Sequence, residues 1–243
     1  MSAELRIAVF SDVHGNLPAL KAVLADIDSR GPFDRLVAAG DYCLKGPDPA
    51  EALDLVLERA DDILKGNTDR DIVDSGASVV DLSRKKQNAI LWARRQLGHE
   101  RISTLDRLQF DAQTVAPDGS SLRVVHANPR DLDERIFPGW TMERFNELFG
   151  DIEDDVIVFG HLHIPFERRF GDRQIFDIAS AGLPQDGDRR AVWGEFTWAP
   201  EHRWCGTIHR VPYDHGDTVL RILDSRMPSP ERRIRDLLRA SYY

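Results

Sequence analysis

The N-terminal part of the chain alternates apolar runs with amphipathic segments, a pattern that predicts a parallel α/β sheet. Leu5–Phe10 predicts a buried strand, and the apolar spacing after it predicts a helix that ends near Gly31. A second strand is expected at 34–39, a helix after Pro47, and a third strand that ends at Gly66. This order predicts parallel strands joined by right-handed crossovers.

The rest of the chain is expected to be more antiparallel. Segment 78–108 predicts a polar helical insertion interrupted near Gly98. The turn residues at 117–120 predict a hairpin between strands around Thr114 and at 122–125. Further elements are a helix at 141–149 capped by Thr141, strands at 155–159, 166–170, 174–178, 191–198 and 203–211, and helices at about 216–240. One domain spanning 1–243 is therefore expected.

Charge and cysteine content restrict the function classes. The 243 residues carry a formal net charge of −9, which argues against a nonspecific nucleic-acid or membrane-surface binder. A small phosphorylated substrate stays compatible, because a site can differ in charge from the whole chain. Cys43 and Cys205 show neither metal spacing nor a disulfide framework. The chain shows no signal peptide and no apolar run of membrane-spanning length, so a cytoplasmic protein is expected.

Polar side chains recur directly after predicted strands. They are Asp12 and His14, Asp41, Asn67, His126, and His161 with His163. Because the carboxyl ends of parallel strands meet at one edge of a sheet, we expect these groups to converge. Asp12 and His14 are two residues apart, so on extended backbone they would point the same way. Carboxylate, amide and imidazole groups placed together favour a metal site.

Each of these residues alone has an ordinary structural explanation. An aspartate after a strand often caps a helix, Asn67 could be a turn residue, and a buried histidine is usually just hydrogen-bonded. Their recurrence at strand ends, beside Gly15, Gly40, Gly66 and Gly160, favours a shared site over separate structural roles.

The order Asp-x-His, Gly-Asp, Gly-Asn, His, Gly-His-x-His resembles the calcineurin-like metallophosphoesterases, and most of all their small bacterial phosphodiesterase group. The resemblance extends from Asp12 to the segment 180–188. It implies an α/β fold of two packed mixed β-sheets flanked by helices, which is a four-layer αββα sandwich.

The resemblance also implies two divalent transition-metal ions. Asp12, His14 and His163 would hold the first ion, Asn67, His126 and His161 the second, and Asp41 would bridge both, with Asp41, Asn67 and His126 counted as catalytic. The implied reaction is hydrolysis of a phosphodiester by a metal-bound hydroxide. Manganese is favoured, and iron, cobalt, nickel or zinc suit the same nitrogen and oxygen donors.

The chain departs from the family pattern after Asn67. Many relatives have a histidine there that is thought to protonate the leaving group, whereas this chain has Thr68, a poor acid at neutral pH. The general acid is therefore unassigned, and a diester or a good leaving group is favoured. Asp69 either orients groups near Asn67 or is solvated. Ala127 follows His126 where a glycine is common.

Candidate substrate contacts near the predicted open edge are Asn16, Asn128 and Arg130, with Arg135 close by. An arginine there could hold a phosphate through two hydrogen bonds, although a surface arginine paired with a nearby carboxylate is the favoured alternative. The basic run Arg84-Lys85-Lys86 is expected to be a solvated helix face.

Three other functions are compatible with the same residues. A phosphomonoesterase or a dinucleotide polyphosphatase would use the same metal ligands on another substrate. A non-catalytic metal-binding scaffold of the same fold would bind a partner instead. A nuclease would be expected to have a basic groove, which the net charge argues against. Assembly into a homo-oligomer stays open.

Overall fold

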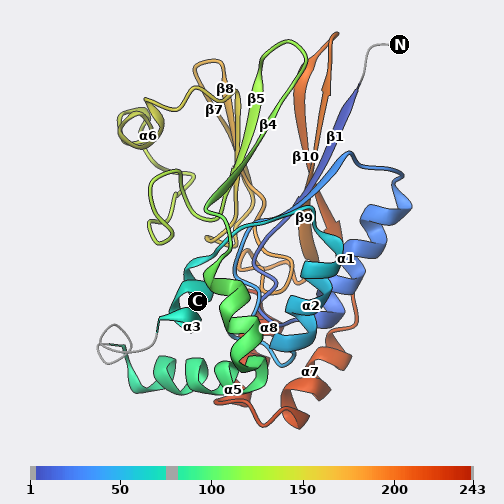
Figure 1. The fold of residues 1–243 in the computed structure, drawn as a ribbon, viewed down its shortest axis with the longest axis vertical. Helices are drawn as coiled ribbons and strands as arrows, with labels where there is room; N and C mark the ends of the chain where they lie inside the picture. The colour runs from blue at the N-terminus through green and yellow to red at the C-terminus, as the bar shows by residue number, and fades with distance from the viewer. Residues whose placement is uncertain (1–3, 75–81, 242–243) are drawn as a thin grey trace.

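The computed structural model describes residues 4–74 and 82–241, and its strands form two five-stranded sheets (Figure 1). The first sheet has the order β10-β9-β1-β2-β3. Its strands are β1 (Leu5–Phe10), β2 (Arg35–Ala38), β3 (Asp62–Ile63), β9 (Ala191–Ala199) and β10 (Arg203–Val211). β1, β2 and β3 are parallel, while β9 pairs antiparallel with β1 and with β10. The predicted parallel beginning is confirmed.

The second sheet has the order β4-β5-β6-β8-β7. Its strands are β4 (Asp111–Val115), β5 (Ser121–Val125), β6 (Val156–Phe159), β7 (Phe166–Phe170) and β8 (Arg173–Asp177). β5, β6 and β8 run parallel, and β4 and β7 pair antiparallel at the two edges. The predicted hairpin between β4 and β5 is confirmed.

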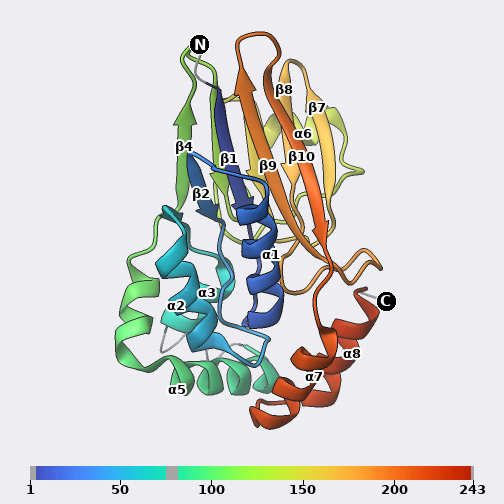
Figure 2. The ribbon, with the colours of Figure 1, turned by 90° about the vertical axis from the view of Figure 1, so that its right-hand side faces the viewer.

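Alternating side chains of β1 explain the layers. Ile7 and Val9 pack between the sheets with residues such as Val124 and Val158, while Ala8 and Phe10 face a second core under the helices. That second core is covered by helices including α1 (Leu17–Ser29) and α2 (Pro49–Arg59). α6 (Met142–Phe149) covers the outer face of the other sheet. The expected αββα sandwich is confirmed (Figure 2).

Further helices lie at the end of the molecule toward which β1 runs (Figures 1 and 2). They include α3 (Asn67–Val73), α5 (Arg84–Asp106), α7 (His215–Asp224) and α8 (Pro230–Arg239). α5 is kinked at Gly98, which has φ 70°, so the predicted interruption is confirmed. The start of the expected insertion, 78–81, lies outside the described residues.

The short helix α3 was not expected from the sequence, because Gly66 to Asp69 was interpreted as a strand end. Asp69 accepts a hydrogen bond from the Gly66 backbone nitrogen at 3.0 Å, which is half of a capping box. None of the helices in the described ranges is both long and apolar enough to cross a bilayer. The expected cellular compartment stays a prediction.

The strand ends converge across two sheets rather than along one. β1, β2 and β3 bring Asp12, His14, Asp41 and Asn67 to the end of the first sheet, and the other histidines follow β5 and β6 of the second. A hydrogen bond of 2.8 Å from the His161 backbone nitrogen to Asp12 Oδ2 joins the two sheet ends. The expectation of a single shared sheet edge was therefore too simple.

Candidate metal centre

The loop after β1 places Asp12 and His14 through an unusual backbone. Their φ angles are 55° and 50°, so neither residue is extended. The two side chains do share a site, but the predicted reason, alternation along extended backbone, was wrong. The Asp12 backbone nitrogen donates a 2.9 Å hydrogen bond to the Gly40 carbonyl, and the His14 nitrogen donates one of the same length to the Asp41 carbonyl. These two bonds fix this loop against the loop after β2. The two side chains share a site because both turns are held.

Three other candidate ligands share this backbone strain, whereas Asn67 and His126 do not. Asp41, His161 and His163 have φ angles of 62°, 68° and 63°. Such conformations cost free energy in residues other than glycine and persist where surrounding contacts enforce them, typically at functional sites. Gly66 allows one of these close approaches, since a Cβ there would lie 2.2 Å from Asp41 Oδ1.

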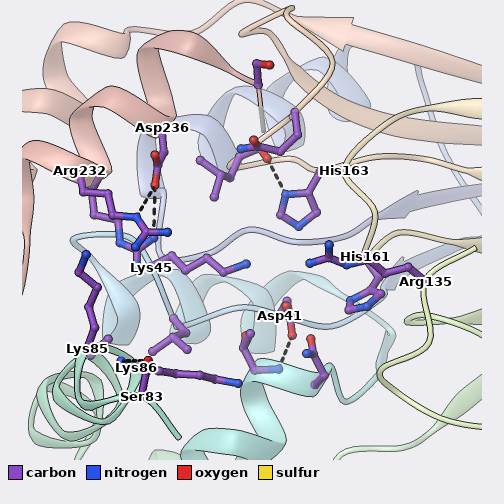
Figure 3. A pocket seen from close by; sticks show the side chains of 18 residues that line it. Asp41, Lys45, Ser83, Lys85, Lys86, Arg135, His161, His163, Arg232 and Asp236 are labelled. Carbon is purple, nitrogen blue, oxygen red and sulfur yellow. Dashed lines mark hydrogen bonds and ion pairs between the residues drawn. The ribbon is translucent and has the colours of Figure 1, made fainter. Parts of the chain in front are cut away.

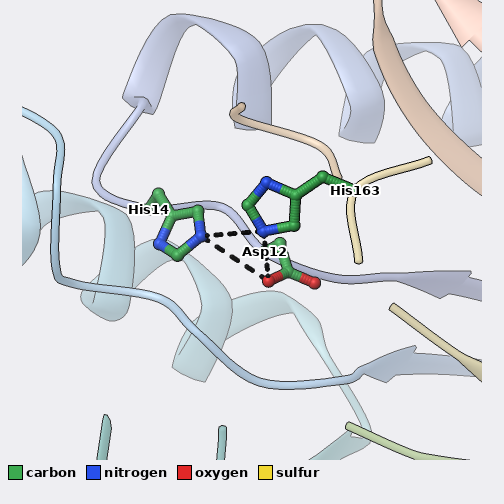
Figure 4. Close-up of side chains that lie close together, drawn as sticks. All are labelled: Asp12, His14 and His163. Atoms are coloured by element: carbon green, nitrogen blue, oxygen red, sulfur yellow. Dashed lines mark hydrogen bonds and ion pairs between the residues drawn. The ribbon is translucent and has the colours of Figure 1, made fainter. Parts of the chain in front are cut away.

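Asp12, His14 and His163 form a compact cluster (Figure 4). His163 Nε2 lies 2.9 Å from Asp12 Oδ1 and 3.1 Å from His14 Nε2. His14 Nε2 lies 3.5 Å from the same Asp12 oxygen. All three side chains are at most 4% exposed. One point between these atoms is thus within reach of three ligand atoms.

The second half of the site is built around Asp41. Asp41 Oδ2 lies 3.8 Å from His14 Nε2, and Asp41 Oδ1 lies 3.6 Å from His126 Nε2. His126 Nε2 is 3.3 Å from Asn67 Oδ1. Asp12, Asp41 and His126 form a second buried group whose ligand atoms lie within 4.8 Å of one another. Asp41 therefore faces both histidines with different oxygens.

Backbone carbonyls fix the orientation of the histidine rings. The Nδ1 atoms of His14, His126 and His163 lie 2.9, 2.8 and 2.6 Å from the carbonyl oxygens of Leu44, Ala39 and Leu183. A neutral ring with Nδ1–H donating there presents an Nε2 lone pair to the site. In His161 it is Nε2 that lies 2.9 Å from the carbonyl of Asp133, which leaves Nδ1 for the site.

This arrangement fits cations better than it fits the protein alone. With Nδ1 protonated, the facing Nε2 atoms of His14 and His163 are both acceptors, and so is Asp12 Oδ1 between them. Acceptors at such distances repel unless a proton or a cation lies among them. The two buried Asp and His clusters are the donor set of divalent metal ions, and the donors are nitrogen and oxygen without thiolate.

The electrostatics of His14, His161 and Asp12 agree with cation binding, whereas His126 differs. Burial would lower the pKa of His126, but the charges of Asp41 and Asp12 outweigh burial and raise that pKa. Burial lowers the pKa of His14 well below its usual value, and nearby Lys45 and His163 lower it further. Burial, followed by the charge of His126, lowers the pKa of His161 to about 4. Burial would raise the pKa of Asp12, but His163 and the other histidines outweigh it and hold that pKa well below the usual range. Neutral imidazoles and an ionised carboxylate are the forms that bind metals.

Asp69 positions Asp41 from behind. Its carboxylate accepts hydrogen bonds from the backbone nitrogens of Asp41 at 2.7 Å, Tyr42 at 3.0 Å and Gly66 at 3.0 Å. Burial, together with the charge of Asp41, raises the pKa of Asp69 to about 7. Of the two alternatives for Asp69, the orienting role is confirmed, because the residue is fully buried.

The proposed substrate contacts Asn16, Asn128 and Arg130 already have structural partners. Asn16 caps α1 and donates hydrogen bonds to the Gly182 carbonyl and the Tyr213 hydroxyl. Asn128 is fully buried and organises the loop that follows it. Arg130 pairs with Asp151 at 2.6 Å. A pocket lies beside the candidate ligands, and Arg135 lines it, whereas none of these three residues does.

Basic residues that the sequence did not single out do line that pocket. Lys45 Nζ lies 3.1 Å from His14 Nε2, and its position four residues after Asp41, in the loop that follows the Gly-Asp turn, could have signalled it. Arg232 and Arg233 come from α8. Lys85 and Lys86 also line the pocket, so the basic run, of which Arg84 and Lys85 are exposed as expected, borders the site as well as solvent. Sequence spacing alone does not show that α5 and α8 fold over the strand ends.

Comparison with known proteins gives consistent matches. The model of the calcineurin-like phosphoesterase superfamily domain matches residues 5–195. A protein of Methanocaldococcus jannaschii, MJ0912, named as uncharacterized, is 30% identical over 240 residues, with 91% of this chain and 93% of that protein covered.

Two solved structures are similar over 98% of this chain and 100% of theirs. A metallophosphoesterase from Sphaerobacter thermophilus is 26% identical with a TM-score of 0.79. The hypothetical protein PH1004 from Pyrococcus horikoshii is 18% identical with a TM-score of 0.82, which shows a common fold. The resemblance found in the sequence motifs is confirmed.

Proposed function

We propose that this chain, which belongs to the calcineurin-like phosphoesterase superfamily, is a dinuclear metal-dependent phosphoesterase that prefers a phosphodiester. The observation that carries the proposal is the pair of buried ligand clusters that share Asp12, the second of which contains Asp41, whose other oxygen faces His14 of the first. Histidines and aspartates with purely structural roles would not need to be gathered into two groups of facing hydrogen-bond acceptors.

Each candidate ligand has a role in this proposal. Asp12, His14 and His163 would hold one cation, and Asn67, His126 and His161 the other. Asp41 would bridge them, since its two oxygens face different histidines. Asp12 is less suited to bridge, because its Oδ2 accepts two hydrogen bonds, from Ser11 Oγ at 2.6 Å and from the His161 nitrogen at 2.8 Å, whereas Asp41 Oδ1 accepts one, from the Thr68 nitrogen.

Bound divalent cations would supply charge neutralisation for the phosphate and a more acidic water at neutral pH. The protein supplies the rest. Backbone carbonyls hold the histidine tautomers. The Thr68 backbone nitrogen donates a 2.8 Å hydrogen bond to Asp41 Oδ1, and Asp69 accepts one from the Asp41 backbone nitrogen, so both the carboxylate and the backbone of Asp41 are held. Lys45 adds a positive charge beside His14 that can stabilise a phosphate oxygen.

Thr68 supports the preference for a diester. The residue is 4% exposed, and its hydroxyl has no hydrogen-bond partner among the described residues. It offers no acid for a poor leaving group at neutral pH. A diester with a good leaving group, held as a small phosphorylated substrate, makes the least demand on proton transfer. A monoester or dinucleotide polyphosphate substrate is the alternative.

The test is hydrolysis of bis(p-nitrophenyl) phosphate and of p-nitrophenyl phosphate by metal-stripped protein, with and without Mn²⁺. Diester turnover that appears with Mn²⁺ and disappears with chelator is expected. Turnover of the monoester alone would keep the metal centre and overturn the diester preference. Stoichiometric metal binding without turnover of any phosphoester would support a non-catalytic scaffold. Replacement of Mn²⁺ by Fe²⁺, Co²⁺, Ni²⁺ or Zn²⁺ ranks the metals.

A further inference from the structure

A pocket of about 440 Å³ adjoins the candidate metal centre (Figure 3). His161 and His163 lie at one side of it, and Arg232, Lys85 and Lys86 lie at the opposite side, with Lys45 extending between them. The pocket therefore extends well beyond the space that a single phosphate at the metal centre would fill. It offers room for a part of the substrate on the side away from the metal ligands.

The lining of this pocket is strongly basic, although the whole chain has a net charge of −9. Its cations are Lys45, Lys85, Lys86, Arg135, Arg232 and Arg233, against the carboxylates of Asp41 and Asp236. Lys86 is partly neutralised by Asp71, whose oxygen lies 2.6 Å away. Such a local surplus of positive charge attracts anions.

Arg232 and Arg233 share one carboxylate. Asp236 Oδ2 lies 3.5 Å from Arg232 Nε and 3.7 Å from Arg233 Nη1, both longer than a good hydrogen bond. Arg233 Nε is buried and has no hydrogen-bond partner within the described part of the chain. Burial lowers the pKa of Arg233, and Arg232 adds to this, while Asp236 opposes it. Two guanidinium groups thus have donors to spare, and phosphate oxygens are their usual partners.

These arginines lie on α8, beyond residue 195, where the match to the superfamily domain ends. They approach the pocket because α8 packs beside α7, which contacts α1. The family match therefore includes Lys85 but neither arginine.

We propose that the side of the pocket lined by Lys85, Arg232 and Arg233 binds a second phosphate group of the substrate, while the metal centre binds the phosphate that is cleaved. That the metal centre binds the cleaved phosphate rests on the proposed function. The substrate class is then a phosphodiester that carries an additional terminal phosphate on one substituent, and not a diester with two neutral substituents.

The first experiment compares two chromogenic esters that differ only in that group. Thymidine 5′-(p-nitrophenyl phosphate) and its 3′-phosphorylated form release the same chromophore. With Mn²⁺ present, the 3′-phosphorylated ester is expected to have at least about tenfold higher kcat/KM, mainly through a lower KM. Equal kcat/KM values for the two esters would overturn the proposal.

The second experiment removes the basic side chains. Arg232 is about half exposed and Lys85 is exposed, so the double variant R232A/K85A should fold. It is expected to lose most of the advantage of the 3′-phosphate and to keep its turnover of the unphosphorylated ester. The matched control R235A/R84A removes the same charge from the same two helices at exposed residues outside the pocket lining. An equal loss in both double variants would contradict a specific site.

A binding measurement separates this inference from the proposed function. Titration calorimetry on the metal-free protein compares thymidine 3′,5′-bisphosphate with thymidine 5′-monophosphate. The bisphosphate is expected to bind at least about tenfold more tightly, and R232A/K85A to remove the difference. Equal affinities would overturn the second phosphate site even if the protein hydrolyses diesters. Tighter bisphosphate binding without hydrolysis of any phosphoester would keep this site and defeat the proposed function.

Discussion

The Nε2 atoms of His14 and His163 face each other at 3.1 Å, while both Nδ1 atoms lie against backbone carbonyls. Neither ring has a proton to place between them when both are neutral. In the metal-free protein the cation that faces this contact is Lys45, whose Nζ lies 3.1 Å from His14 Nε2.

Divalent metal should stabilise the protein strongly. Mn²⁺ at about 100 times its Kd adds about 2.7 kcal/mol, which corresponds to a rise in Tm of roughly 5–10 °C for a chain of this size. Thermal unfolding with Mn²⁺ and with chelator measures the shift. H163A, which removes a ligand of one of the two cations, should reduce it, whereas H202A, which changes an exposed histidine, should keep it. An unchanged Tm in the parent protein would contradict a metal site here.

Asp41→Asn should remove most activity. An amide has one oxygen to offer, so it cannot face both His14 and His126 as the carboxylate does. We expect a loss of at least about 100-fold in kcat/KM and less than full metal content by elemental analysis. D172N, an exposed turn substitution, is the control. Parental turnover and metal content in D41N would mean that the bridging ligand is misassigned.

Gly66→Ala should weaken metal binding without touching a ligand. The new Cβ would lie 2.2 Å from Asp41 Oδ1 and 2.3 Å from the Asp41 nitrogen, so Asp41 must move. A fall in metal affinity of roughly 10–100-fold is expected from titration calorimetry. Gly139 has open space around its Cβ position, so G139A should bind metal like the parent. Similar affinities in the two variants would show that Asp41 tolerates displacement.

Asp177→Asn should stabilise the metal-free protein increasingly as pH rises. Burial raises the pKa of Asp177 well above its usual value, the Ala179 backbone nitrogen opposes this, and the charge of Asp12 adds to it. The folded state thus favours the protonated form, so the parent has its full stability below the unfolded pKa of about 3.9 and loses part of it as pH rises through the folded pKa.

The neutral asparagine avoids that loss. Urea unfolding in chelator at about pH 5 and about pH 8 measures it, and the gain in unfolding free energy of D177N over the parent should be larger at the higher pH. D172N should show no such trend. A gain that shrinks toward pH 8 would mean that Asp177 is ionised at little cost in the fold.

The sequence predicted most of the framework and the ligand positions. β1 was predicted with its observed bounds, because an apolar run followed by a polar turn is a strong local signal. The reason predicted for the shared direction of the Asp12 and His14 side chains was wrong. Both residues have left-handed backbone, which hydrogen bonds to the Gly40 and Asp41 carbonyls enforce, and those carbonyls are distant in sequence.

The basic part of the pocket could not be predicted from the sequence. Whether Lys85 or Arg232 is solvated or faces the site depends on how α5 and α8 pack, and periodicity gives only the face of a helix and not its neighbour. α3 was missed for the opposite reason. A helix of this length is marginal alone, and its first turn depends on the Asp69 hydrogen bond to Gly66 and on packing against α5.

The division of the candidate ligands between two sheets has a consequence for how the protein folds. Asp12 and Asp41 follow strands of one sheet, and His126 and His161 follow strands of the other. Neither sheet alone contains a complete site, so tight cation capture has to wait until the two sheets have docked. Metal uptake followed in time during refolding would therefore report the formation of contacts between distant parts of the chain, a step that is slow to form in proteins rich in such contacts.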